Sequence, residues 1–204
     1  MDKLAAYQKI VDDIKQHHCS LRDGCKQAVP GEGNPNSSIV FIGEAPGRKE
    51  DELGQPFVGA AGKLLAEGLA QIGLTREDVY ITNVVKCRPP DNRDPLPEEV
   101  EEHKPFLECE LELIQPKLIV LLGRHALHWF LPDLQISQAR GTAKRLGNRI
   151  FYPVYHPAAA LYDPKLRTVF ISDIQKIPLI LEKIEKLSTN SPAPVSTTQA
   201  TIFN

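Results

Sequence analysis

The sequence predicts an α/β protein in which helices cover both faces of a mostly parallel central sheet. Four short apolar runs, at 39–42, 79–85, 118–122 and 150–154, are typical of buried strands. Segments with helical spacing alternate with these runs, which favours a doubly wound, three-layer α/β/α arrangement. A chain of 204 residues is long enough for one such domain with its own core.

The N-terminal half contributes two of these strands and two helices. Apolar residues at helical spacing predict an amphipathic helix over residues 1–15, and a loop rich in Gly, Pro, Asn and Ser follows at 30–38. The strand at 39–42 runs into a glycine turn. A helix rich in Leu and Ala is predicted over 63–72, because the glycine at 73 is a C-terminal stop signal.

The strand at 79–85 leads into a stiff, proline-rich loop. A helix should begin near Pro97, since proline suits the first helical turn, and it should bend at Pro105. The remaining predicted elements are a strand, a short helix, a further strand and a closing helix, at 118–122, 125–131, 150–154 and 172–187. Beyond residue 187 the composition changes to Ser, Thr, Pro and Ala, so we expect a domain over 1–187 and a disordered tail over 188–204.

The composition argues against a highly basic nucleic-acid-binding protein, a membrane protein and a secreted protein. The 24 Lys and Arg against 26 Asp and Glu give a formal net charge of −2, so any nucleic-acid contact must come from a local basic patch. The longest aliphatic run, Leu118–Leu122, is far shorter than the roughly 20 residues that span a bilayer. The first residues lack the apolar segment of a signal peptide, so we expect a cytoplasmic protein. Its four cysteines are then metal ligands or core residues rather than disulfides.

Two glycine-rich segments mark a candidate ligand site. The segment Gly43–Gly47 (GEAPG) directly follows a buried strand, where ligands bind in such sheets, and glycines such as Gly43 let the backbone approach a substrate. An ordinary strand-to-helix turn is the alternative. The segment 50–62 then places an acidic cluster, a Pro-Phe pair and three glycines before a helix. Phe57 in this polar loop can stack on a flat ligand, or it can anchor the loop on the core.

Two further strand ends carry polar side chains. Asn83 offers a donor and an acceptor together, which suits the edge of a base, although an asparagine at a strand end can also bond its own backbone. His156, fixed by the following proline, can donate a hydrogen bond to an oxygen that gains charge. A histidine that is only structural is the alternative.

These motifs, in this order, resemble those of the uracil-DNA glycosylases, and the match is close to the iron–sulfur type, family 4. The resemblance covers about residues 14–180 and is carried by GEAPG, EDELGQPFVGAAG, VYITNVVKCRPPDNRDPLPEEV and YHPAAAL. It implies the fold of that family and a hydrolase of base-excision repair. Such an enzyme flips uracil out of DNA and hydrolyses its N-glycosidic bond, leaving an abasic site. A catalytically silent relative that binds damaged DNA is the alternative.

The resemblance also assigns roles at the site. Glu44 and Ala45 match the motif that holds the uracil edge and positions water, and Glu50 matches a second acidic position. Ala45 stands where better-known uracil glycosylases carry a catalytic aspartate, so which of the two carboxylates activates water stays open. By the same resemblance, the candidate base-binding residues are the stacking phenylalanine, the edge-reading asparagine and the histidine that faces uracil O2, namely Phe57, Asn83 and His156.

The cysteines depart from the family pattern. The family binds a four-iron, four-sulfur cluster through four cysteines, of which Cys19 and Cys87 match the second and third. The first position falls on Gln16 and the fourth on His103.

Three interpretations of this departure stay open. His103 can replace a thiolate as ligand, and helical spacing points it inward. Alternatively, Cys25 and Cys109 replace the missing pair, although Cys109 faces elsewhere on the helix. In the third interpretation the cluster is lost.

The resemblance implies contacts with DNA, and we expect a monomer. The basic residues expected to contact phosphates are Lys86, Arg88, Arg93, Arg124, Lys144 and Arg145, although each can equally be a solvated surface charge. Leu161, in the loop after His156, is the candidate wedge that enters the groove. The tail segment Gln199–Phe203 resembles the Q-x-x-L/I-F peptide by which repair proteins dock on sliding clamps, a short pattern that also arises by chance.

Overall fold

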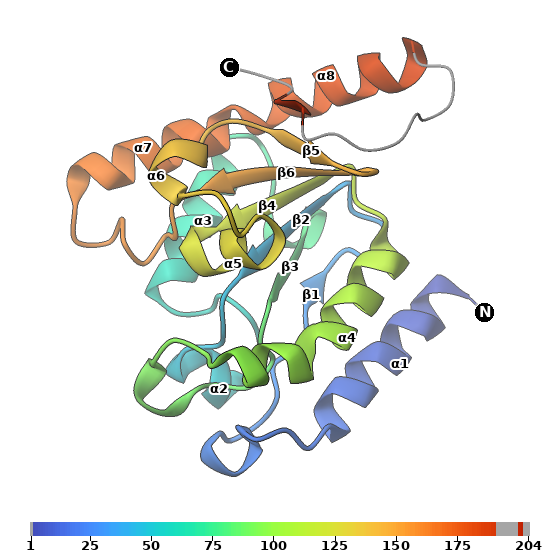
Figure 1. Cartoon of the computed structure of the whole chain (residues 1–204), viewed down its shortest axis with the longest axis vertical. Coiled ribbons are helices and arrows are strands. Elements are labelled where there is room, and N and C mark those ends of the chain that lie inside the picture. The colour runs from blue at the N-terminus through green and yellow to red at the C-terminus, as the bar shows by residue number, and fades with distance from the viewer. Residues whose placement is uncertain (1, 191–199, 202–204) are drawn as a thin grey trace.

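The computed structural model describes residues 2–190 and 200–201, and within them one sheet carries helices on both faces (Figure 1). Its strand order is β1-β3-β2-β4-β6-β5-β7. The four central strands are parallel to one another: β3 (Tyr80–Asn83), β2 (Ile39–Gly43), β4 (Leu118–Leu122) and β6 (Arg149–Val154). The predicted three-layer α/β/α architecture with a mostly parallel sheet is confirmed.

Three short antiparallel strands complete the edges of the sheet, and none of them was predicted. They are β1 (Glu32–Gly33), β5 (Lys144–Leu146) and β7 (Ala200–Thr201), and two or three residues are too few to show a period. Strand β7 lies within the predicted tail and pairs with β5. Apart from these two residues, the tail beyond Asn190 and the candidate clamp peptide Gln199–Phe203 lie outside the described residues.

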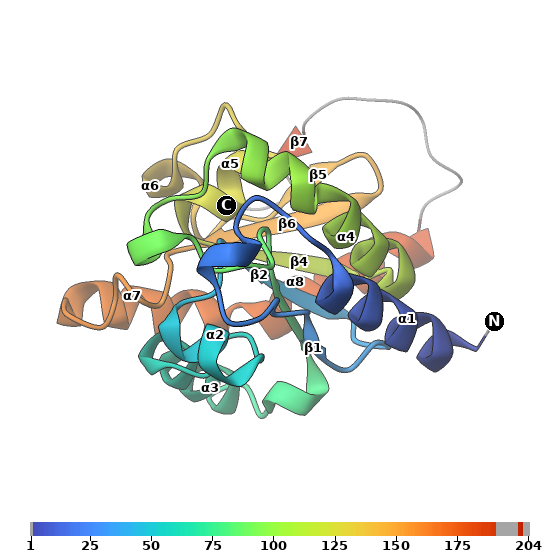
Figure 2. The same cartoon turned by 90° about the horizontal axis from the view of Figure 1, so that it is seen from below.

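Strand side chains alternate between two apolar layers. Phe41 and Val120 pack in the layer covered by α3 (Ala60–Ala70), α7 (Pro164–Gln175) and α8 (Ile177–Asn190). Val40 and Leu121 pack in the opposite layer. Figure 2 shows α1 and α4 together on that side, and the helices that contribute to it are α1 (Lys3–Gln16), α4 (Pro97–Ile114), α5 (Gly123–Phe130) and α6 (Ile136–Ala139). Because every central strand is buried on both faces, side chains of these strands can contact a ligand only at the strand ends.

The predicted closing helix differs from the structure. The predicted closing helix at 172–187 is two helices, α7 and α8, and Pro178 lies in the first turn of α8, where proline is tolerated. Helix α7 begins earlier than predicted because the Asp163 carboxylate accepts hydrogen bonds from the N–H groups of its first turn. Helix α4 continues through Pro105 as one element. The short helices are α2 (Arg48–Leu53) and the 3₁₀ turns Arg22–Gly24, Arg76–Asp78 and Pro90–Asn92. No described helix is long and apolar enough to cross a lipid bilayer.

A buried carboxylate on α4 connects this helix to β3. Glu110 accepts hydrogen bonds from the Gly31 N–H at 3.0 Å, the Tyr80 hydroxyl at 3.1 Å and the Thr82 hydroxyl at 2.9 Å. The Lys86 ammonium lies 2.6 Å from the same carboxylate. Lys86 is only 1 % exposed, so it cannot reach a phosphate, and its predicted DNA contact is wrong.

Removing one partner of this pair should destabilise the fold. The Lys86→Ala variant leaves the Glu110 carboxylate buried without its cation, which costs on the order of 3–5 kcal/mol of unfolding free energy. Guanidinium unfolding of purified protein measures the loss. The control is Lys9→Ala, which removes an exposed ion pair to Asp13 and should leave unfolding unchanged. Equal midpoints for the two variants would contradict the structural role of Lys86.

Candidate active site

A cavity of about 330 Å³ opens at the carboxyl ends of the central strands. Six side chains that the sequence singled out line this one cavity, although they come from five separate segments of the chain: Glu44, Ala45, Glu50, Phe57, Asn83 and His156. The stiff loop after β3 supplies another wall through Asn92 and Asp94, which were not predicted. Such a volume suits a small planar ligand.

Gly43 is the point at which three parts of the site meet. A Cβ on Gly43 would lie 2.4 Å from the Asn83 side-chain oxygen and 2.5 Å from the Phe57 ring. Only glycine therefore allows these two side chains to approach the end of β2. Asn83 is 2 % exposed, and its Oδ1 has no hydrogen-bond partner among the described residues. A buried acceptor without a partner is costly, so this oxygen is available to a ligand that carries an N–H.

Phe57 forms a fixed wall of the cavity. Its backbone adopts φ 53°, a left-handed conformation that costs a non-glycine residue on the order of 1–3 kcal/mol. The surrounding chain imposes this conformation. Arg76 donates to the Phe57 carbonyl at 2.8 Å, and a Cβ on Gly62 would lie 1.7 Å from the same oxygen. The Phe57 and His156 ring centroids are 5.7 Å apart, so both rings border the same space.

His156 presents a neutral N–H donor. Its Nδ1 accepts a hydrogen bond from the Ala158 N–H at 3.1 Å, which leaves the ring proton on Nε2. Burial, with a smaller effect of His125, lowers the pKa of His156 to about 4, so the ring is uncharged at neutral pH. Gly123 permits this position, because a Cβ there would lie 2.8 Å from the His156 Cβ.

Glu44 is a carboxylic acid close to its titration point at neutral pH. Burial and the neighbouring Asp94 carboxylate raise its pKa to about 7, against an opposing effect of Arg124. His125 Nε2 lies 3.7 Å from Glu44 and 3.3 Å from Asp94. The sequence analysis missed Asp94 and His125, although His125 follows the end of β4 by the same topological rule that singled out the other strand ends.

Glu50 has a positioning role that the sequence did not reveal. Its Oε1 accepts hydrogen bonds from the N–H groups of Val58 at 2.9 Å and Gly59 at 2.8 Å, at the start of α3. These bonds fix the segment that follows Phe57 and satisfy donors that the helix leaves unpaired. Between the two candidate carboxylates, Glu44 is the one without such a backbone commitment in the described structure.

Most of the predicted phosphate contacts are engaged or distant. Arg88 donates to the Asn92 side chain at 2.7 Å, and Arg93 pairs with Glu99. Lys144 and Arg145 lie on β5, and Arg145 pairs with Ile150 near the beginning of β6, at the opposite end from the cavity. Arg124 is exposed beside the site, where it pairs with Asp94. Two further exposed cations, Arg48 and Lys49, directly follow the cavity residue Gly47 and pair with Glu52. These three side chains are more exposed than those of Arg88 and Arg93, and surface ion pairs of this kind are weak enough for a phosphate to replace them.

The loop after His156 differs from its prediction. Leu161, the candidate wedge, is partly buried against the hydrophobic core. The adjacent Tyr162 is 91 % exposed. Tyr162 is therefore the large side chain that this loop presents to solvent.

The candidate metal ligands meet on the other side of the stiff loop. Cys19, Cys87 and His103 place one ligand atom each within 4.8 Å of one another, and the predicted inward orientation of His103 is confirmed by its complete burial. Contact with Cys87, and then His103, lowers the pKa of Cys19 to about 4 despite its burial. Contact with Cys19, with burial and Cys25, raises the pKa of Cys87. Cys25 therefore lies next to this cluster.

A four-iron cluster does not fit this donor set. Each protein ligand of such a cluster binds a different iron atom, so the ligand atoms must surround a body larger than a single ion. Here three donors already lie within 4.8 Å of one another. Gln16, at the first ligand position, is exposed, and Cys109 is also exposed on α4. We therefore assign no step to an iron–sulfur cluster.

Comparison with known proteins agrees with this fold. Residues 30–176 match the sequence profile of the uracil DNA glycosylase superfamily, so the chain belongs to that superfamily. Within it, type-4 uracil-DNA glycosylases are 41–54 % identical to this chain over most of its length, and the resemblance to family 4 is confirmed. The Archaeoglobus fulgidus protein is 54 % identical over 168 residues, which cover 78 % of this chain and 84 % of the relative. The Thermotoga maritima protein is 44 % identical over 81 % of this chain and 88 % of the relative.

The Glu44→Gln variant should be more stable than the parent at pH 8. The folded-state pKa of Glu44 is raised, so its favourable contribution is complete below the unfolded value near 4.5 and is lost as the pH rises through about 7. Glutamine carries no charge to bury. We expect a gain on the order of 1–3 kcal/mol at pH 8 that disappears near pH 4, measured by denaturant unfolding. A variant that is less stable than the parent at pH 8 would refute the buried-carboxylate description.

Proposed function

We propose that the protein hydrolyses the N-glycosidic bond of uracil in DNA after the base has been flipped into the cavity. The observation that carries this proposal is the unpartnered, buried Oδ1 of Asn83 in the same cavity as the Phe57 ring and the Nε2–H of His156. Together these groups offer a stacking surface, an acceptor and a donor, which match the face, the N–H and a carbonyl of a pyrimidine. The type-4 relatives carry the name of this activity.

The charges of the site support the reaction. When the C1′–N1 bond breaks, its electron pair stays on uracil, and the neutral N–H of His156 stabilises the negative charge that develops on O2. A water oxygen then bonds to C1′ of the sugar. Glu44, with its pKa near 7, accepts the proton that this water loses, and Glu50 holds the segment that positions Phe57. The product is an abasic site.

The remaining predictions on partners follow from this proposal. The exposed cations Arg48, Lys49 and Arg124 are the phosphate contacts that we propose, and Tyr162 replaces Leu161 as the side chain that enters the duplex. We propose that the protein is a monomer and that it acts on DNA in the cytoplasm. Docking on a sliding clamp through Gln199–Phe203 stays a prediction. The four-iron, four-sulfur cluster is no part of the proposed reaction.

Removing the donor should remove most of the activity. The His156→Ala variant should release uracil from a uracil-containing oligonucleotide about 10²–10³-fold more slowly, because one preorganised donor to a developing anion contributes that much. A single-turnover assay with excess enzyme measures the chemical step, and circular dichroism verifies the fold. The matched control is His128→Ala, on the surface of α5. Wild-type rates for His156→Ala would exclude the proposed role.

The rate should depend on pH through Glu44. Because Glu44 acts as a base only after it loses its proton, the single-turnover rate should rise through about pH 7 and level off above it. The Glu44→Gln variant should be slower and lack this rise, whereas Glu50→Gln should keep it. His156, with its pKa of about 4, should contribute no change between pH 5 and 9. A rise that persists in Glu44→Gln would transfer the role of base to another group.

A further inference from the structure

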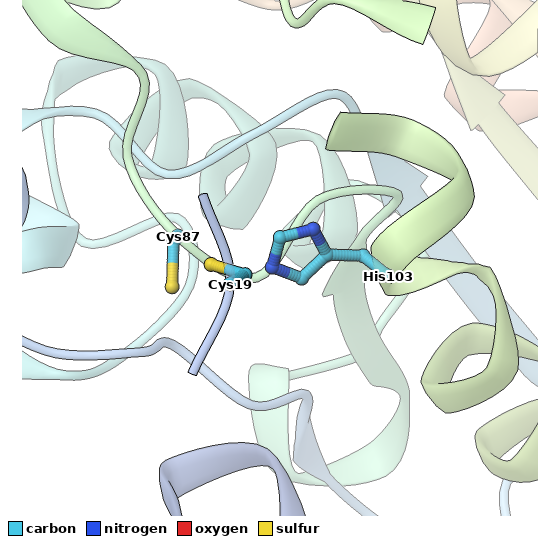
Figure 3. Close-up of side chains that lie close together, drawn as sticks. All are labelled: Cys19, Cys87 and His103. Atoms are coloured by element: carbon cyan, nitrogen blue, oxygen red, sulfur yellow. The ribbon is translucent and has the colours of Figure 1, made fainter. Parts of the chain in front are cut away.

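The cluster of Cys19, Cys87 and His103 brings three distant segments of the chain together (Figure 3). Cys19 lies just beyond the end of α1, Cys87 follows β3, and His103 is on α4. In Figure 3 the ring of His103 points toward the sulfur of Cys19, and the sulfur of Cys87 lies beside it. Sulfur and imidazole at this proximity form a donor set that binds soft or borderline metal ions.

The hydrogen bonds of His103 define which ring nitrogen is available. Its Nδ1 lies 2.7 Å from the Glu99 carbonyl oxygen, which can only accept, so Nδ1 carries the ring proton and donates it. The other nitrogen, Nε2, therefore has a free lone pair. This nitrogen is buried without a partner in the described structure, on a residue that is 0 % exposed. Metal-bound histidines are held in this way, with one nitrogen donating to a carbonyl and the other on the ion.

The spacing of the donors is close to that around a single ion. Around one tetrahedral zinc, with bonds of about 2.3 Å to sulfur and about 2.0 Å to nitrogen, neighbouring ligand atoms lie roughly 3.5–3.8 Å apart. The three atoms here, all within 4.8 Å of one another, need to contract by only about 1 Å to reach that spacing.

Cys25 is placed to complete the ligand set. Its half-buried thiol adjoins Cys87, at the end of the short 3₁₀ turn Arg22–Gly24. In the described structure this thiol contacts Arg22, which donates to its sulfur at 3.5 Å. The fourth cysteine, Cys109, is exposed on α4 and is not part of this ligand set.

We propose that Cys19, Cys25, Cys87 and His103 bind one tetrahedral zinc ion, in a chain whose donors do not fit an iron–sulfur cluster. Three thiolates and one imidazole are a closed, structural zinc set with no open position for catalysis. This inference concerns the stability of the fold, and the evidence for it does not rest on the proposed activity.

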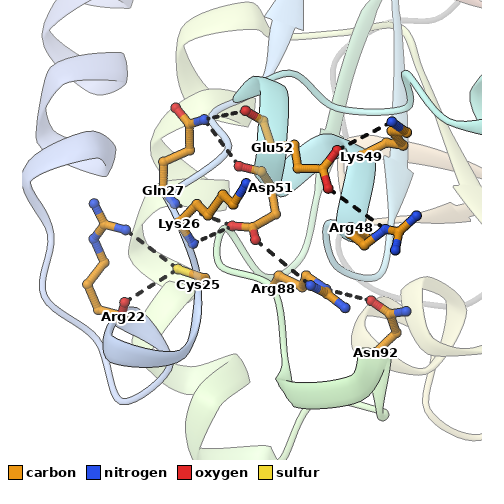
Figure 4. A network of polar contacts seen from close by, with 10 residues as sticks. All are labelled: Arg22, Cys25, Lys26, Gln27, Arg48, Lys49, Asp51, Glu52, Arg88 and Asn92. Carbon is orange, nitrogen blue, oxygen red and sulfur yellow. Dashed lines mark hydrogen bonds and ion pairs between the residues drawn. The ribbon is translucent and has the colours of Figure 1, made fainter.

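The ion would act on the active site through a loop. In Figure 4 the segment that follows Cys25 lies against α2, where the Asp51 carboxylate accepts hydrogen bonds from the backbone N–H of Lys26 at 2.8 Å and of Gln27 at 3.3 Å. Asp51 adjoins Glu50, which fixes the start of α3. Zinc at Cys25 therefore holds the loop that supports this acidic segment.

Metal analysis of the full-length protein, purified anaerobically, is the first test. We expect about one zinc per chain and no acid-labile sulfide. After replacement by Co²⁺, the spectrum should show the intense visible bands of a tetrahedral ion and strong thiolate charge-transfer absorption. About four irons and four sulfides per chain would overturn the proposal, as would a chain that binds neither Zn²⁺ nor Co²⁺ tightly.

Variants assign the ligands. Cys25→Ser should weaken zinc binding at least about tenfold and reduce the thiolate absorption of the Co²⁺ form, whereas Cys109→Ser should change neither. An unchanged Co²⁺ spectrum for Cys25→Ser would overturn the assignment of the fourth ligand. His17, whose buried Nε2 also lacks a partner and whose ring centroid is 5.8 Å from that of His103, would then be the next variant.

Substitution of His103 by leucine distinguishes a ligand from a core residue. If no ion binds, His103→Leu removes an unpaired buried nitrogen and should raise or preserve the melting temperature. If zinc binds, the melting temperature of the variant should be at least about 10 °C below that of the parent. A strong chelator should then lower the melting temperature of the parent but leave that of the variant unchanged. Hydrogen exchange at Lys26 and Gln27 should accelerate in both the variant and the chelated parent. A His103→Leu protein as stable as the untreated parent would overturn the proposal.

Discussion

The buried carboxylate of Glu110 is the constraint on which much of the molecule depends. It faces β3 from α4 and collects four donors, among them the Lys86 ammonium. The same ammonium donates to the backbone carbonyl of Asn83 at 2.8 Å. A charge inside the layer of helices is thus connected directly to Asn83, the residue that we propose binds the edge of the base. Since α4 also carries His103, the position of this one helix sets both the cavity wall and the candidate zinc site.

The central strands were predictable because a strand that is buried on both faces is a continuous apolar run. The run at 118–122, for example, has the same bounds as β4. Edge strands such as β5 were not predictable, since they contain few residues and bury little. The site residues at strand ends were predictable by topology and by family resemblance. The burial of Lys86 was not, because sequence alone does not reveal that a buried carboxylate 24 residues away accepts a hydrogen bond from its ammonium group.

The electrostatic arrangement of the cavity separates two tasks. His156 is kept neutral by burial, so it donates without carrying charge, while Glu44 is kept near its titration point by burial and by Asp94. Both shifts arise from the same dry environment, which disfavours cations and anions alike. At the rim of the cavity, Asp94 raises the pKa of Glu44 and Arg124 lowers it. Changes at the rim therefore alter the proton affinity of the site without touching a bound base.

The left-handed backbone of Phe57 has a consequence for the end of the catalytic cycle. Arg76, Gly62 and Gly43 hold this ring in place before any ligand arrives, so the slot has its final shape in the empty protein. Because the cavity needs no rearrangement, binding of a ligand loses no conformational entropy of these protein groups. In the reaction that we propose, the detached base would keep the same stacking and edge contacts after the sugar has been released. Free uracil should therefore linger as an inhibitor, and departure of the small product, rather than of DNA, becomes a candidate for the slow step of turnover.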